Sequence, residues 1–300
     1  MKKCYQSQNK NLIAFDASAK INLYLHVTGK KENGYHLLDS LFAFADCGDK
    51  IVVCSSDNFV FKVRGKFAKD LADCSHNIVI KAFEEVRRYL PEDAVNRESV
   101  EITLFKNLPV ASGIGGGSAD AAATIKALCQ FWHLSLSEKT LKDIAVKLGA
   151  DVFPCLEGYA SQVSGIGDIV KPYYNMPARI YGVLINPLIA VSTPSVFKKY
   201  QPNFSKAMPF DDKKITKKDF FIGLNQRKND LELAAIEVCP EIEKVLDSLK
   251  NTEGCVLSRM SGSGATCFGL YRTKKEAKAA KQRISKAFNG WWVKEISISN

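Results

Sequence analysis

The sequence predicts an α+β protein of two domains, in which mixed sheets pack against helices. The chain has 300 residues, of which 46% are hydrophobic, enough to bury two cores or the core of one large α/β unit. Apolar and polar residues alternate in several short segments, and other segments are rich in helix-forming residues. The sequence contains no internal repeat and no low-complexity tract. We place the two domains at residues 1–165 and 166–300.

The first strand is predicted at residues 20–27. Its apolar positions are Ile21, Leu23, Leu25 and Val27, and they alternate with Asn22, Tyr24 and His26. One face of this strand should therefore be buried, while the other can present polar groups to a site. Asn33 and Gly34 then predict a tight turn.

The next elements are a mixture of strands and helices. Strands are predicted at residues 51–54, 59–63 and 100–105, and helices at 78–90, 121–128 and 137–148. The alternation within residues 100–104 is typical of a half-exposed antiparallel strand. Gly149 should end the third helix, and Pro154 prevents the chain from continuing it.

The second half of the chain has the same mixed character. Strands are predicted at residues 180–185, 266–271 and 292–298, a long helix at 231–249, a glycine-rich turn at 261–264 and a basic helix at 274–288. The boundary between the domains is expected near residues 160 to 170.

The net charge of +10 at pH 7 makes nucleic-acid binding worth testing, because clustered Lys and Arg release counterions from phosphates. The lysines of residues 274–286 have the spacing of a solvated helix face, and those of residues 213–218 flank a short polar link. We expect no nucleic-acid partner. A general attraction for small anions accounts for the same charge.

The cysteines and the apolar runs indicate a protein of the cytoplasm. Nine cysteines form no Cys-x-x-Cys pair and only four histidines accompany them, so we expect reduced thiols and no metal site built from protein side chains. The chain turns polar directly after Met1, unlike a secretory signal, and no apolar run has the length of a membrane span. A membrane partner is not expected.

The strongest motif is a glycine loop that leads directly into a helix. Four glycines, Gly113, Gly115, Gly116 and Gly117, lie within five positions and precede Ser118 and an alanine-rich segment. Such a backbone can expose its amide hydrogens beside the positive end of a helix dipole, which is an arrangement that holds phosphate. A flexible linker is the alternative, but a linker would not run straight into a helix.

Two common nucleotide motifs do not match this loop. A P-loop requires Gly-Lys-Ser/Thr at its end, and Gly117 is followed by Ser118 instead. The dinucleotide motif counted from Gly113 requires a sixth-position glycine and again meets Ser118. Two further glycine clusters, at residues 164–167 and 260–265, taken alone predict turns.

At this point the sequence resembles the GHMP kinases, whose phosphate loop has the form P-x-x-x-G-x-G-G-G-S, matched here by residues 109–118. Within that family it is similar to the branch that acts on 4-diphosphocytidyl-2-C-methyl-D-erythritol. The segments that carry this closer resemblance are residues 19–23, 28–36, 149–153, 229–232 and 258–265. The sequence departs from the pattern at Ser18, where proline is frequent, at Ala119, where a second serine is common, and in its first ten or so residues, which extend beyond the usual start.

The resemblance implies the two-domain GHMP kinase fold and an ATP-dependent, Mg²⁺-assisted phosphorylation of the substrate 2-hydroxyl, in the non-mevalonate route to isoprenoid precursors. It implies Asp151 as the general base and Lys20 as the group that stabilises charge. For ATP it implies Pro109, Val110, Ala111, Ser112, Gly113, Ile114, Gly115, Gly116, Gly117, Ser118 and Ala119, with Asn77 and Lys106 as weaker candidates near the adenine. For the diphosphocytidyl substrate it implies Asn22, Tyr35 and His36.

Two alternative functions remain open from the sequence. Another GHMP kinase, of the homoserine or mevalonate type, would share the loop. Its substrate has no cytidine for Tyr35 and His36 to bind, so these two residues distinguish the alternatives. A noncatalytic nucleotide-binding or nucleic-acid-binding protein would have no need for both Lys20 and Asp151. For the oligomeric state we expect a monomer or a weak homodimer.

Overall fold

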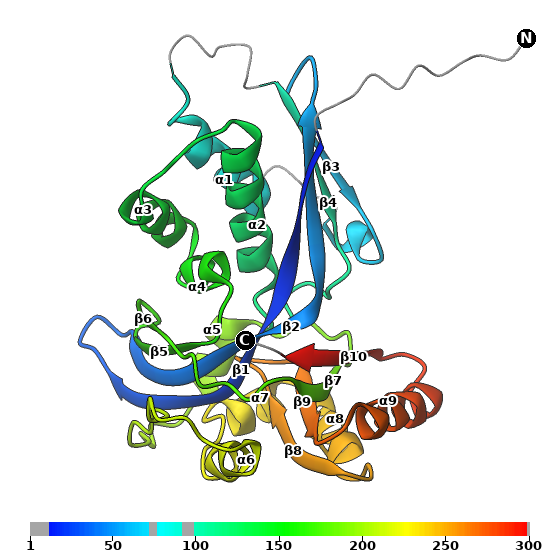
Figure 1. Cartoon of the computed structure of the whole chain (residues 1–300). Helices are drawn as coiled ribbons and strands as arrows, with labels where there is room; N and C mark the ends of the chain where they lie inside the picture. Colours follow the sequence, from blue (N-terminus) through cyan, green and yellow to red (C-terminus); the bar gives the residue numbers. More distant parts are fainter. Residues whose placement is uncertain (1–11, 72–76, 92–98, 299–300) are drawn as a thin grey trace, which may run out of the picture. The chain divides into compact units, whose positions relative to one another are not determined.

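The computed structural model describes residues 12–71, 77–91 and 99–298 (Figure 1). The chain forms two compact units, each assembled from separate stretches. The first unit consists of Met1–Ala17, Asp49–Leu108 and Gly117–Leu156, and the second of Ser18–Gly48, Pro109–Gly116 and Glu157–Asn300. The expected division of the chain at residue 165 stays a prediction.

Two long strands run from one unit into the other. These are β1 (Leu12–Lys30) and β2 (His36–Ser55), which pair with each other. The predicted strand at residues 20–27 is the central part of β1, but its polar face is buried rather than open. Tyr24, for example, is fully buried and donates a hydrogen bond to Asp39 Oδ1 at 2.9 Å.

The first unit combines a small mixed sheet with helices. Its strands are β3 (Val60–Arg64), β4 (Val100–Phe105) and the carboxyl end of β2; its helices are α1 (Ile78–Arg87), α2 (Gly116–Phe131), α3 (Glu138–Leu148) and α4 (Val152–Glu157), with a 3-10 turn at Ala68–Leu71. β4 pairs antiparallel with β2, as the alternation predicts, and parallel with β3. Because it has a neighbour on each side, β4 buries more of its residues than a half-exposed strand would.

The second unit is built on an antiparallel sheet. Its strand order is β10 (Trp292–Ile298), β7 (Ile180–Asn186), β9 (Cys267–Tyr271) and β8 (Cys255–Met260). β10 runs along the whole of β7, from the pair Trp292 and Asn186 to the pair Ile298 and Ile180. A hairpin of β5 (Ser161–Gly165) and β6 (Ile169–Pro172) pairs with the amino-terminal half of β2. The glycine cluster at residues 164–167 forms the turn of this hairpin.

Helices complete the second unit: α5 (Thr193–Lys199), α6 (Lys217–Asn225), α7 (Glu232–Val238), α8 (Glu241–Lys250) and α9 (Lys274–Ala287). The single long helix predicted at residues 231–249 is wrong, because α7 ends at Val238 and α8 starts after Pro240. A proline has no backbone N–H for the helical ladder, and its ring clashes with the preceding turn. The basic helix is confirmed as α9, which Thr273 and Glu276 start with a capping box.

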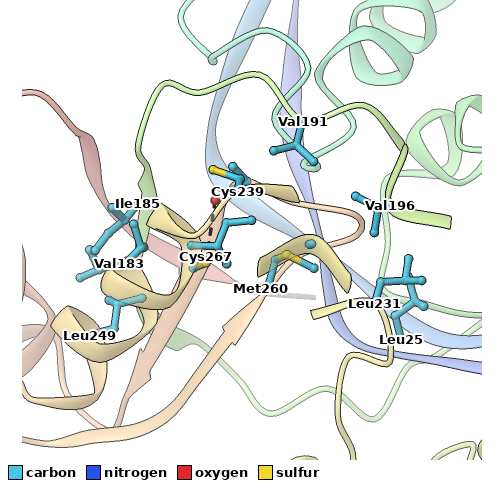
Figure 2. Close-up of a cluster of buried hydrophobic side chains, with 14 of the residues drawn as sticks. Leu25, Val183, Ile185, Val191, Val196, Leu231, Cys239, Leu249, Met260 and Cys267 are labelled. Atoms are coloured by element: carbon cyan, nitrogen blue, oxygen red, sulfur yellow. Dashed lines mark hydrogen bonds between the residues drawn. The ribbon is translucent and has the colours of Figure 1, made fainter. Parts of the chain in front are cut away.

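A large apolar core lies between this sheet and its helices. Figure 2 shows Val183, Ile185 and Leu249 on one side of it and Leu25, Leu231 and Met260 on the other. Met260 ends β8 and Cys267 begins β9, so this core holds both ends of the glycine-rich turn at residues 261–264. No helix in the described part of the chain is both long and apolar enough to cross a membrane.

Candidate active site

The glycine loop adopts a backbone that ordinary residues rarely take. Gly113 and Gly115 have φ angles of +75° and +64°, and Ala111 has +50°. The last part of the motif is already helical, since α2 begins at Gly116. The first amides of a helix have no partner inside it, and the helix dipole is positive there. The loop therefore ends in a group of N–H donors suited to an anion.

A second glycine turn, residues 261–264, packs directly against this loop. Ser261 Oγ donates to the carbonyl oxygen of Gly113 at 3.1 Å, and Thr266 N donates to that of Ser112 at 3.1 Å. A Cβ atom on Gly113 would lie only 2.6 Å from the carbonyl oxygens of Ser261 and Gly264. The turn that the sequence predicts here thus supports the loop, a role that the residues alone did not indicate.

Gly113→Ala should consequently distort the loop. The new methyl group would meet backbone oxygens, which cannot move aside as a flexible side chain can, and alanine at this φ is itself strained. We expect a loss of about 2 to 3 kcal/mol in the free energy of unfolding, measured by urea denaturation. Gly117→Ala is the control, because the nearest neighbour of its Cβ would be Ile78 Cγ2 of α1 at 3.8 Å, an ordinary contact distance. Equal stability of the two variants would contradict the close packing.

Lys20 lies beside the loop and is buried. Its backbone N donates to the carbonyl oxygen of Ile114 at 2.9 Å, and its side chain is in contact distance of the place where a Cβ on Gly115 would stand. The ammonium donates to Asn22 Oδ1 at 3.0 Å and lies 4.2 Å from the ring centre of Phe42. The structure thus brings Lys20, Asn22 and the loop together within the second unit, as the sequence predicted.

Asn22 connects this lysine to the second glycine turn. Its backbone N donates to Ser261 Oγ and its Nδ2 to Ser40 Oγ, both at 3.0 Å. Each polar group around Lys20 is therefore oriented by another hydrogen bond, which limits how far the ammonium can move.

Further polar residues form hydrogen bonds with the backbone of the turn at residues 261–264 and of the strand that leads into it. Asn229 Nδ2 donates to the carbonyl oxygens of Met260 and Gly262, at 2.9 and 2.8 Å, and Met260 N donates to Glu232 Oε2 at 2.9 Å. Arg259 reaches the carbonyl oxygen of Leu23 at 2.6 Å. These residues fall in segments 229–232 and 258–265, which carry the family resemblance. That resemblance was the only sign of them in the sequence.

Asp151 and Asn77 belong to the first unit. Asp151 is half-buried and stands directly before α4, where its carbonyl oxygen accepts from Cys155 N at 3.3 Å. Asn77 is the N-cap of α1, and its Oδ1 accepts the backbone N–H of Val79 at 2.9 Å. The cap accounts for the Asn77 side chain without a ligand.

Lys106, a candidate for the adenine pocket, has its ammonium between two buried carboxylates. Its Nζ lies 2.5 Å from Asp49 Oδ2 and 2.8 Å from Asp120 Oδ2. Asp49 Oδ1 also accepts the backbone N–H groups of Asn107 and Leu108. This triad of Asp49, Lys106 and Asp120 ties the end of β4 to α2. The ammonium therefore has a structural role, and a role of Lys106 toward adenine stays a prediction.

The charges within the triad are unequal, one cation facing two acids. Burial lowers the pKa of Lys106, but the charges of Asp120 and Asp49 outweigh it and the net shift is upward. Burial raises the pKa of Asp120 well above its usual range; Lys106 opposes this shift and Asp49 adds to it. Asp120 Oδ1 makes no hydrogen bond among the described residues. Burial therefore disfavours the ionised form of Asp120 relative to an exposed carboxyl group.

Tyr35 and His36 lie where β1 turns into β2. Tyr35 is 61% exposed, and its backbone N donates to Asn33 Oδ1 at 3.3 Å. The His36 ring stacks on Phe197 with centres 4.8 Å apart and meets the edge of Tyr200 at 5.9 Å. Burial, with a smaller effect of Lys30, lowers the pKa of His36, so the ring is neutral near pH 7.

The glycine positions of the loop and of the second turn are closely packed. A Cβ atom on Gly113 or Gly262 would come within 2.8 Å of a backbone oxygen, and one on Gly115 would lie 3.1 Å from the Lys20 side chain, so larger residues do not fit there. In the described residues, no group of three or more His, Cys, Asp and Glu side chains is arranged to hold a metal ion.

Comparison with known proteins shows the family to which the chain belongs. Residues 77–159 match the sequence model for the GHMP kinases N terminal domain, and residues 218–290 match that for the GHMP kinases C terminal domain. A 4-diphosphocytidyl-2-C-methyl-D-erythritol kinase of Paramagnetospirillum magneticum is 41% identical over 280 residues, covering 93% of this chain and 96% of the relative. A kinase of the same description from Parvibaculum lavamentivorans is 42% identical and covers 94% and 97%.

Solved structures agree in fold. A 4-(cytidine 5'-diphospho)-2C-methyl-D-erythritol kinase matches with a TM-score of 0.76 and 27% identity, over 96% of this chain and all of that one. A homoserine kinase from Cytophaga hutchinsonii matches with a TM-score of 0.68 over 99% of this chain and 97% of the other. At 20% identity, the second match shows the fold alone.

Proposed function

Because the chain belongs to the 4-diphosphocytidyl-2-C-methyl-D-erythritol kinase family of the GHMP kinases, we propose that it transfers the γ-phosphate of ATP to the 2-hydroxyl of 4-diphosphocytidyl-2-C-methyl-D-erythritol. This step would serve the non-mevalonate route to isoprenoid precursors. The observation that carries the proposal is the loop of residues 109–116, which packs against a second glycine turn and is bordered by a buried lysine.

The loop and the first turn of α2 would hold the ATP phosphates. The residues proposed for this are Pro109, Val110, Ala111, Ser112, Gly113, Ile114, Gly115, Gly116, Gly117, Ser118 and Ala119. The positive φ angles and the N–H groups of the helix start support this role. Mg²⁺ bound with ATP would neutralise phosphate charge, and any contact from a loop hydroxyl to this ion would fall to Ser118. Asn77 and Lys106 are proposed near the adenine.

The chemistry is a single in-line displacement at phosphorus. The substrate hydroxyl oxygen forms a bond to the γ-phosphorus, the bond from that phosphorus to the β,γ-bridging oxygen breaks, and ADP leaves. We assign acceptance of the hydroxyl proton to the Asp151 carboxylate. Lys20 would stabilise the negative charge on the transferred group, and its burial strengthens that interaction.

Recognition of the cytidyl substrate is assigned to Asn22, Tyr35 and His36. The exposed ring of Tyr35 is available for stacking on a pyrimidine, and a neutral His36 can both donate and accept a hydrogen bond. Asn22, next to Lys20, would contact the erythritol portion. The stacking of His36 on Phe197 is equally what simple packing would give, so this residue needs its own test.

His36→Ala is expected to raise KM for the cytidyl substrate by about three- to tenfold and to leave KM for ATP unchanged, as loss of one aromatic contact implies. Steady-state kinetics with each substrate varied in turn would measure both constants. Phe197→Leu is the control, because it removes the ring on which His36 packs but keeps the imidazole. An equal rise of both KM values in His36→Ala would indicate a packing role instead.

The proposed function is tested by offering the purified protein ATP and Mg²⁺ with the diphosphocytidyl alcohol, homoserine or mevalonate. We expect ADP release coupled one-to-one to phosphorylation of the diphosphocytidyl alcohol, and rates with the other two alcohols at least about a hundredfold lower. Preference for homoserine or mevalonate would support another GHMP kinase. ADP release without a phosphorylated product would refute the assignment.

We further propose a cytoplasmic protein that acts as a monomer or weak homodimer, without a nucleic-acid or membrane partner. Cys239, Cys255 and Cys267 carry thiols, and burial raises the pKa of Cys255 and Cys267, which makes them poorly reactive. Unreactive buried thiols are compatible with a reducing compartment.

A further inference from the structure

A pocket of about 320 Å³ lies on the second unit, at the edge formed by β7, β10 and α9. Four of its lining residues are cationic, namely Arg179, Lys274, Lys281 and Lys294, and two are acidic, Asp46 and Glu295. None of them belongs to the glycine loop, to the turn at residues 261–264 or to the other residues assigned above. This is a separate concentration of positive charge.

Positive charge exceeds negative charge in this pocket, with four cationic side chains against two acidic ones. Among the described residues, none of them takes part in an ion pair or a side-chain hydrogen bond. Of the two acids, Asp46 is engaged by Ser297, whose backbone N and Oγ donate to it at 2.8 and 2.7 Å. The two acids offset only part of the positive charge, and solvent or a bound anion would reduce the repulsion that remains.

The positions of these groups are set by the fold. Lys274 and Lys281 are seven residues apart on α9 and so lie on the same side of it, two turns apart. Arg179 directly precedes β7 and has a φ angle of +66°, which a non-glycine residue seldom adopts. The carbonyl oxygen of Arg179 accepts a hydrogen bond from Lys217 Nζ at 3.0 Å, which holds this backbone and adds a fifth cation nearby.

We propose that this pocket binds a small phosphorylated anion of about the size of a diphosphate. A concave surface with an excess of one sign of charge concentrates its field, and it raises the local concentration of oppositely charged ligands. Arginine offers paired N–H donors to phosphate oxygens, and lysines add point charges around them. The hydroxyl of Tyr181, which also lines the pocket, is a further donor.

The size of the pocket favours a small ligand over a polymer. Its volume is at the lower end of ligand pockets, which start at about 300 Å³. A nucleic-acid surface would instead follow the open face of α9, where Lys278 and Lys286 are exposed but do not line the pocket. Both substrate and product of the proposed reaction carry phosphates, so the occupant could be one of them or a free phosphate compound; the chemistry recognised is the same.

The test is a calorimetric titration of the full chain with inorganic pyrophosphate, followed by CDP and ATP to compare the possible sources. We expect one pyrophosphate-binding event per chain in the parent, and an affinity for that event at least about tenfold lower in the variant that combines Arg179→Gln with Lys281→Gln. Turnover should stay at the parent value, because neither residue is in the catalytic machinery. If this variant had altered turnover but kept the parent affinity for pyrophosphate, the binding proposal would be wrong, and the result would concern the proposed function instead.

The matched control combines Lys278→Gln with Lys286→Gln, which removes the same charge from exposed positions of α9 outside the pocket. Its pyrophosphate affinity should remain within about threefold of the parent. Equal weakening in both double variants would show a diffuse field and overturn the proposal, as would unchanged binding in the first. If Arg179→Gln impairs folding, Lys281→Gln with Lys294→Gln tests the same site without the strained residue.

Discussion

Asp151→Asn is expected to lower turnover by about two to four orders of magnitude, the range for loss of a positioned proton acceptor, with little change in ATP affinity. Asparagine has the size of aspartate and can still orient a hydroxyl, but it cannot accept the proton. Single-turnover kinetics would measure the chemical step, and fluorescence titration with an ATP analogue would measure binding. Turnover within about threefold of the parent would remove Asp151 as the base.

The double variant with Lys20→Met tests whether the two residues act as a unit. Lys20 and Asp151 belong to different compact units of the chain, and both are assigned to the same step. If they cooperate, the double variant should be about as slow as the slower single variant, because either loss alone already disables the unit. Fully additive losses would show that each residue contributes independently. Asn22→Ala is a useful comparison, since it keeps the lysine and removes the Oδ1 acceptor at 3.0 Å, together with the bond to Ser40 and the proposed contact to the erythritol portion.

Lys106→Met is expected to lower the free energy of unfolding by about 3 to 5 kcal/mol, because it leaves the carboxyl groups of Asp49 and Asp120 buried without their cation. This is a large part of the total for a domain, typically about 5 to 15 kcal/mol. Urea denaturation would measure the loss.

Lys62→Met is the matched control, because Lys62 pairs with Glu101 at 2.8 Å in the same unit but at the surface. It should cost no more than about 1 kcal/mol. A loss in Lys106→Met no larger than in this control would show that the buried triad contributes little.

Asp120→Asn separates charge from shape within the triad. Burial raises the pKa of Asp120 and so disfavours its ionised form, and an amide keeps the shape of the carboxyl group without its charge. The variant should therefore lose clearly less stability than Lys106→Met in the same measurement. A loss equal to that of Lys106→Met would mean that Asp120 acts as a charged partner of Lys106.

Much of the site was open to prediction because its parts are local in sequence. Four glycines in five positions before an alanine-rich segment predict a phosphate loop from backbone freedom alone, and α2 does start within that motif. The last strand and the basic helix were similarly predictable, since alternation and lysine spacing are read from consecutive residues. The break between α7 and α8 could have been predicted too, because Pro240 stands in the sequence.

The sequence by itself determined the glycine loop, its helix, most strands of the sheets and the family to which the chain belongs, because each depends on neighbouring residues or on motif order. Tertiary structure alone decided which distant groups meet. Gly113 and Ser261 are far apart in the chain yet share a hydrogen bond, and Lys106 finds Asp49 and Asp120 only when β2, β4 and α2 pack together. Tertiary structure also decided that the polar face of β1 is buried, because other elements cover both faces of that strand. Alternation in the sequence gives the period of the side chains in a strand, but it does not tell what covers each face.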